Sequence, residues 1–98
     1  MTVRAPLPLG DGEFIQLADF LISQEFLNGG RAEPGFTGVL YTSPGGVELW
    51  IDASTIEKVK YQPFIFTHPS GNKFPAYRTT IFTTNPVHQR VVLLSCPK

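Results

Sequence analysis

The hydrophobic pattern changes its period at Pro34, and this change constrains the fold more than any other feature of the sequence. Before it, apolar side chains between Phe14 and Ile22 recur every three to four residues, the spacing of one buried helical stripe. After it, apolar and polar residues alternate in short runs separated by Pro, Gly, Asn and Ser, which is typical of strands and turns. The pattern therefore predicts an α+β fold.

The best helix candidate covers residues 13–27. Asp11 is a candidate N-cap, and the glycines of residues 28–30 supply the left-handed conformations that end many helices. Phe20 falls near the polar side of this helix. The helix therefore either packs between two surfaces or ends near Ser23.

Residues 1–12 contain two prolines and two glycines and predict an extended arm. An arm of this kind either extends into solvent or binds a neighbouring molecule. Residues 13–98 then form a single domain, because a chain of this length fits one domain and can bury a core. Cys96 is the one cysteine, which excludes an internal disulfide.

The second part of the chain predicts an antiparallel meander of about five strands, on which the helix packs. Residues 37–43 and 47–52 form the clearest hairpin, with Pro44-Gly45 at the centre of a type II turn. Residues 53–61 fit two alternatives, a helical turn with a capping box or a strand. Pro63 restricts the next strand to an edge, a bulge or a strand start, because proline cannot donate a ladder hydrogen bond. The later strands are expected at residues 64–68, 76–84 and 87–95.

Alternation within these strands predicts which side chains share a face. Val47, Leu49 and Ile51 fall on one face, which leaves Trp50 on the other. Phe64 and Phe66 share a face and are expected in the core, and the aliphatic run Val91–Leu94 suits a central strand.

The charges are divided along the chain, although the formal net charge is zero. The residues up to Glu57 include eight acidic and two basic side chains, a charge of −6, and those after it include six basic and no acidic ones, a charge of +6. Opposed charges of this kind steer association and permit head-to-tail packing of identical copies. Whether the two sets form separate faces depends on the topology.

The sequence contains no motif with a catalytic or cofactor-binding mechanism. The imidazole and thiol groups of His68, His88 and Cys96 lack the close spacing of a zinc site. No nucleophile elbow surrounds a serine, and no glycine-rich phosphate loop follows a strand. We therefore expect no enzymatic activity, no cofactor, no bound metal and no small-molecule substrate.

These features favour a non-enzymatic protein interaction module, either a small subunit of a larger assembly or a protein inhibitor. Its partner would be another protein or a second copy of the chain. A viral or phage structural component is one such assembly. No targeting segment and no membrane-spanning run is recognisable, so we expect no membrane partner and a cytoplasmic location, or the host cytoplasm or virion for a viral protein.

The alternative hypothesis is single-stranded nucleic-acid binding by the basic, aromatic C-terminal strands. Bases would stack on the rings while the cations neutralise phosphates. In a protein contact, Trp50 would be the first aromatic anchor, unless its strand is buried on both faces. The candidate partner-binding residues are Trp50, Tyr61, Lys73, Tyr77, Arg78 and Arg90.

Overall fold

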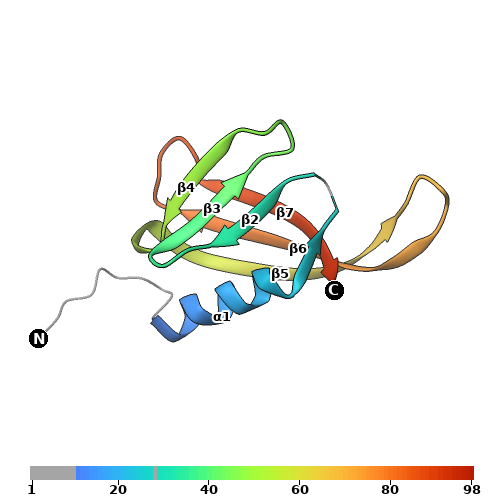
Figure 1. Cartoon of the computed structure of the whole chain (residues 1–98), viewed down its shortest axis with the longest axis horizontal. Helices are drawn as coiled ribbons and strands as arrows, with labels where there is room; N and C mark the ends of the chain where they lie inside the picture. Colours follow the sequence, from blue (N-terminus) through green and yellow to red (C-terminus); the bar gives the residue numbers. More distant parts are fainter. Residues whose placement is uncertain (1–10, 28) are drawn as a thin grey trace, which may run out of the picture.

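The computed structural model describes residues 11–27 and 29–98, which form one α-helix, seven strands and one 3-10 turn (Figure 1). The elements are α1 (Asp11–Ile22), β1 (Gln24–Phe26), β2 (Arg31–Pro34), β3 (Gly38–Thr42), β4 (Glu48–Asp52), η1 (Ala53–Thr55), β5 (Ile56–Thr67), β6 (Lys73–Thr83) and β7 (Arg90–Pro97). The predicted α+β class, with an N-terminal helix and antiparallel strands, is confirmed. The strands are more numerous than the expected five or so, and they form two sheets.

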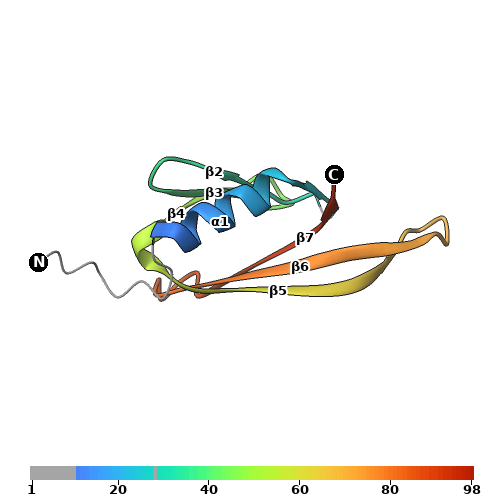
Figure 2. The ribbon, with the colours of Figure 1, turned by 90° about the horizontal axis from the view of Figure 1, so that it is seen from below.

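The two sheets lie in different layers (Figure 2). Strands β1, β7, β6 and β5, in that order, form a four-stranded antiparallel sheet, here called the long sheet. Strands β2, β3 and β4 form a three-stranded antiparallel sheet, here called the short sheet. Helix α1 and the short sheet cover one face of the long sheet, its inner face. No described segment covers the opposite, outer face.

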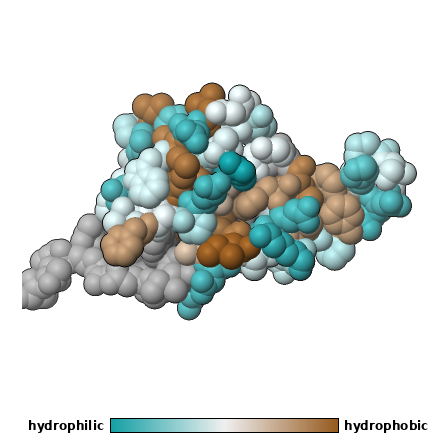
Figure 3. Space-filling view, in the orientation of Figure 1, coloured by the Kyte–Doolittle hydropathy of each residue, from teal (hydrophilic) through white to brown (hydrophobic). Residues whose placement is uncertain are grey.

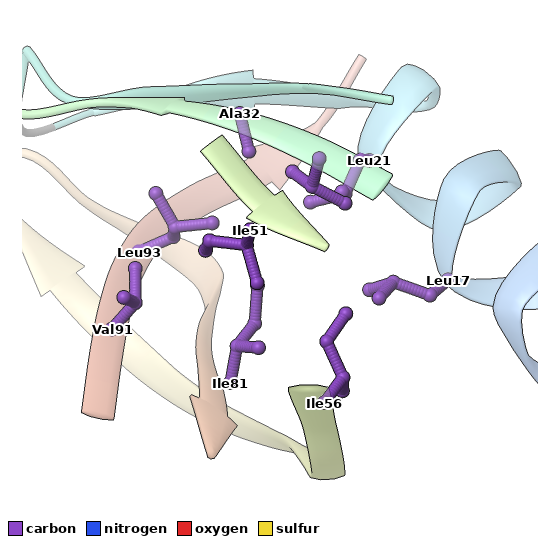
Figure 4. Packing of buried hydrophobic residues seen from close by; sticks show 9 residues of the cluster. Leu17, Leu21, Ala32, Ile51, Ile56, Ile81, Val91 and Leu93 are labelled. Carbon is purple, nitrogen blue, oxygen red and sulfur yellow. The ribbon is translucent and has the colours of Figure 1, made fainter. Parts of the chain in front are cut away.

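The core lies between these layers, where side chains from both sheets and the helix point toward one another (Figure 4). Alternation along β4 and β7 places one face of each strand in this core, as expected for sheets that bury one side. Each fully buried Leu, Ile or Val contributes roughly 1.5–3 kcal/mol. The buried cluster consists of Leu17, Leu21, Ala32, Val39, Ile51, Ile56, Ile81, Val91 and Leu93.

The helix begins at Asp11 and ends at Ile22, which agrees with the shorter of the two predicted lengths. Its last turn closes where the Ser23 backbone N–H donates to the Phe20 and Asp19 carbonyls, each at 3.1 Å. The chain then enters β1, which pairs with β7, so Glu25 lies on a strand. Residues 11–12 of the predicted arm belong to α1, and its residues 1–10 lie outside the described part of the chain.

The predicted β3–β4 hairpin is confirmed, but the expected type II turn is wrong. A type II turn over residues 43–46 needs a positive φ at its third residue, Gly45. The structure instead has a positive φ, 87°, at the fourth residue, Gly46. The Gly46 N–H donates to the Ser43 carbonyl at 2.9 Å. A proline at the second position of a turn and a glycine at the fourth are typical of a type I turn followed by a glycine bulge. His68–Gly71 repeats this arrangement, with φ 92° at Gly71.

Residues 53–61 satisfy both of their predicted alternatives in succession, first η1 and then the start of β5. Asp52 caps the turn, because its Oδ1 accepts a 3.0 Å hydrogen bond from the Ser54 backbone N–H. Strand β5 is an edge strand, one of the three positions that Pro63 allows, and β7 is central, as the run Val91–Leu94 predicts.

One expected strand residue and one expectation about the core are wrong. Val47 lies outside β4 and is 69% exposed, although Leu49 and Ile51 share the inward face as expected. Phe64 and Phe66 share a face as expected, but this face is the outer one, because it alternates with the side of β5 that carries Val59. Neither ring belongs to the core cluster.

Strands β5 and β6 extend far beyond the rest of the long sheet (Figure 1). Strand β7 pairs with β6 only from Tyr77 to Phe82, whereas β5 pairs with β6 as far as Lys73. Residues 63–76 therefore form a two-stranded ribbon that leaves the body of the molecule, here called the projecting hairpin.

Candidate functional site

The outer face of the long sheet carries four cations, Lys58, Lys60, Arg78 and Arg90, which we call the basic face. Alternation puts them on one side of their strands, because Val59, Thr79, Ile81, Val91 and Leu93 occupy the inner side. The register then aligns them: Lys58 and Arg90 both pair with Phe82, one from each neighbouring strand. Residues more than 30 positions apart thus meet across three strands.

Phe82 lies at the centre of this cluster. Its ring centroid is 5.2 Å from Lys58 Nζ, 5.8 Å from Lys60 Nζ and 5.6 Å from Arg90 Cζ. Arg78 Cζ lies 5.7 Å from the ring centroid of Phe64. Cation–π contacts at exposed positions contribute about 0.5–1 kcal/mol each, so the rings hold the cationic groups together against their mutual repulsion.

The positive charge of the basic face is not neutralised. Within the described residues, no carboxylate forms an ion pair with any of the four cations. Two acidic side chains lie at the margins of the face. Glu25 pairs with Cys96 on edge strand β1, and Glu57 occupies the bulge of β5 beside Phe82 and Arg90. The centre of the face therefore attracts negatively charged groups.

The basic face is hollowed by a shallow open depression with a partly apolar floor. Val92, which is 37% exposed, and half-buried Leu94 contribute aliphatic surface. A floor of this kind inside a ring of polar and charged groups is the usual anatomy of a protein interface. The lining includes Lys60, Gln62, Arg78, Phe82, Val92 and Leu94.

The projecting hairpin continues the basic face away from the body. Phe64, Phe66 and Phe74 lie on the same side of the ribbon as Lys60, and the Phe66 and Phe74 ring centroids are 5.2 Å apart. On the other side, Ile65 is 62% exposed. On this other side, which faces the viewer in Figure 3 together with the short sheet, hydrophobic residues extend from the body along the hairpin and hydrophilic ones cover its tip. A two-stranded ribbon is marginally stable by itself, so its exposed apolar residues are suited to contact a partner.

The opposite side of the molecule, the outer face of the short sheet, carries acidic side chains. Glu48, Trp50 and Asp52 alternate along β4 and share this face with Glu33 of β2, and we call these four residues the acidic face. Arg31, the one cation there, pairs with Glu33 at 3.2 Å. Hydrogen bonds from Ser54 hold the pKa of Asp52 below its ordinary value, so this carboxylate stays ionised.

The Trp50 ring is exposed to 47% and rests on two glycines. A Cβ atom at Gly35 would lie 2.9 Å from its Cη2, and one at Gly38 would lie 2.7 Å from its Cζ2. The alternative of a strand buried on both faces does not apply to β4. The ring is instead a fixed aromatic surface between two carboxylates.

The structure brings together two of the six predicted partner-binding residues. Arg78 and Arg90 lie on the basic face, whereas Trp50 lies on the acidic face and Lys73 begins β6 on the projecting hairpin. Tyr61 and Tyr77 face inward against the helix, with ring centroids 4.2 Å and 5.7 Å from that of Phe20. Burial against Phe20 raises the pKa of the Tyr61 hydroxyl.

Two residues of the basic face, Lys58 and Lys60, and the Phe82 ring at its centre are missing from the predicted set. The signal that identifies the two lysines is alternation from Lys58 through Lys60 to Phe64, which can be recognised once residues 53–61 are assigned to a strand beyond their first turn.

The described part of the chain contains no cluster of three or more His, Cys, Asp or Glu side chains that could hold a metal ion. Among residues 11–27 and 29–98, no helix is long and apolar enough to cross a membrane. Comparison with protein-family models, with curated proteins and with solved structures found no match.

Proposed function

We propose that this chain is a non-enzymatic protein-docking module, a small subunit of a larger assembly, and that it binds an acidic protein surface through its basic face. The observation that carries the proposal is the convergence of four unneutralised cations on a sheet face that no described segment covers. Complementary charge of this kind speeds encounter and rejects partners of like charge.

The apolar floor of the basic face favours a protein over a nucleic acid. Val92 and Leu94 offer aliphatic surface, which packs against apolar side chains and gives no stacking platform for bases. The Phe82 ring is half-buried, and three cationic groups already surround it. A single-strand platform needs open rings, and this ring is not open.

The projecting hairpin extends the same contact beyond the body. Its outer side adds Phe64, Phe66 and Phe74 to the docking surface, and exposed Ile65 lies on its other side. A partner that fits between the body and the hairpin would bury apolar area at both.

Single-stranded nucleic acid is the second candidate, because unpaired Lys and Arg groups on one face also suit phosphates. It predicts binding of a fluorescent oligonucleotide with an affinity that falls steeply with salt and weakens on Arg78→Glu. Undetectable binding at low salt would exclude this candidate.

The proposed function is tested with the purified chain immobilised as bait in an extract of its native host. Arg78→Glu/Arg90→Glu reverses half of the basic face, and Arg31→Glu/Lys98→Glu makes the same charge change outside that face and outside the projecting hairpin. We expect the unmodified chain and the Arg31/Lys98 variant to retain the same protein, after nuclease treatment, and the Arg78/Arg90 variant to lose it. Equal capture by all three would overturn the proposal, and a captured enzyme that loses activity would identify an inhibitor.

A further inference from the structure

We propose that the acidic surface bound by the basic face is the acidic face of a second copy of this chain, so that copies associate head to tail. This inference rests on the proposed function, whose partner it names. The two faces lie on opposite layers of the same molecule; four of the six cations that follow Glu57 lie on one, and three of the eight acidic residues lie on the other.

The acidic face presents its groups in a row. Glu48, Trp50 and Asp52 are alternate residues of β4, so neighbours in the row are separated by about 7 Å along the strand. An aromatic ring thus stands between two carboxylates. Because the ring is held against Gly35 and Gly38, it loses little rotamer freedom on binding.

The basic face presents the complementary arrangement. Its depression lies among Lys60, Arg78 and Arg90, with Val92 and Leu94 in the floor. The exposed side of the Trp50 ring of a second copy can cover this depression, contact the aliphatic floor and meet the guanidinium groups in cation–π contacts. The carboxylates on either side of the ring then lie over the cations that surround the depression.

A contact between two different faces of identical copies is heterologous. Each copy that joins leaves one acidic face and one basic face free, at opposite ends of the assembly. The copies therefore form an open chain, or a ring if the rotation between neighbours closes.

Two variants that each lose one face test this arrangement. Glu48→Lys/Trp50→Ser disrupts the acidic face and leaves the basic face intact. Arg78→Glu/Arg90→Glu disrupts the basic face and leaves the acidic face intact. Neither variant can extend a chain alone, but an equimolar mixture can form one contact between two intact faces. We expect monomers from each variant alone, a capped dimer from the mixture, and a mass for the unmodified chain that rises with concentration and falls with salt.

Analytical ultracentrifugation measures these masses, and circular dichroism checks that each variant folds. Trp50→Ser alone provides a milder variant, expected to raise the dissociation constant of the unmodified chain by at least about tenfold, as loss of an interface hot spot does. An unmodified chain that stays monomeric at low salt, or a mixture that stays monomeric while both variants are folded, would overturn the inference. If the immobilised chain then captures a different protein from the host extract, the proposed function would still hold, and only the head-to-tail association would be excluded.

Discussion

Trp50 lies across Gly38 so closely that a Cβ atom at Gly38 would stand 2.7 Å from Trp50 Cζ2. The same Cβ would also collide with the Ile51 carbonyl oxygen, and this oxygen belongs to the backbone of β4 and cannot rotate away. The packing of the ring on the short sheet therefore depends on a position without a side chain.

We expect Gly38→Ala to lower the free energy of unfolding by about 3 kcal/mol, because overpacking a fixed backbone contact forces β3 and β4 apart. Gly45→Ala is the matched control, since the nearest atom to its Cβ would be Ser43 Oγ at 3.9 Å. Urea denaturation followed by Trp50 fluorescence measures both. A loss below about 1 kcal/mol for Gly38→Ala would show that the short sheet can shift to admit the methyl group.

Tyr61 makes the free energy of unfolding depend on pH in the alkaline range. Its pKa is raised above the ordinary 10.0 by burial in the folded state, so the folded chain keeps this proton after the unfolded chain has lost it. The unfolded state then binds fewer protons, and the free energy of unfolding falls as pH rises above about 10. Tyr61→Phe has no proton to lose at this position.

Urea denaturation of Tyr61→Phe and of the unmodified chain between pH 8 and about 11 tests this assignment. The difference between their free energies of unfolding should be constant below pH 10 and should shift in favour of the variant above it. Lysines titrate equally in both proteins and cancel in the difference. Parallel curves over the whole range would contradict the prediction.

The fold class could be predicted from the sequence because periodicity reports local structure directly. The change of period at Pro34 indicates a helix followed by strands, although β1 and β2 already precede it, and Pro63 limits its strand to three positions, of which β5 occupies the sheet edge. Strands β1 and β2 have only three and four residues, too few to show a period, so the second sheet could not be predicted.

The candidate site was harder to predict, because it depends on which face of the long sheet the other layer covers. Alternation alone assigns Phe64 and Phe66 to a shared face, and it cannot distinguish a core face from an open one. That choice is made by α1 and the short sheet, whose Leu17, Leu21 and Ile51 lie in the core cluster on the opposite side of the long sheet. Charge division along the chain left open whether the two sets of charges form separate faces, because that depends on the topology.

Thr79 places a hydroxyl group in the core without a partner. The residue is fully buried on β6, and within the described residues its Oγ1 has no hydrogen-bond partner. Burying an unpaired hydroxyl costs about 1–3 kcal/mol by mutational measurements. We expect Thr79→Val, which keeps the shape and removes the hydroxyl, to raise the free energy of unfolding by about 1 kcal/mol.

Thr79→Ser is the opposite change, since it keeps the hydroxyl and removes the methyl group. We expect it to lower the free energy of unfolding by about 1 kcal/mol, the contribution of one buried methyl group. Thermal and urea unfolding of the pair measure both effects. A destabilised Thr79→Val would show that the hydroxyl is satisfied in solution.

The projecting hairpin should be dispensable for folding, because it adds no side chain to the core cluster. Replacing residues 65–75 by Asn-Gly joins Phe64 to Ala76, which are cross-strand partners, through a favoured two-residue turn. We expect the free energy of unfolding to change by less than about 1 kcal/mol, as for surface changes away from the core. Ile81→Ala, in the buried part of the same strand β6, should instead lower it by about 3 kcal/mol.

Urea denaturation of these two variants separates the roles of the hairpin and the body. If the shortened chain folds as expected and captures less partner than the unmodified chain, the hairpin acts in docking and not in folding. A shortened chain that unfolds would show that the Phe66–Phe74 ring pair and its neighbours stabilise β5 and β6 from beyond the body, and the hairpin would then be structural.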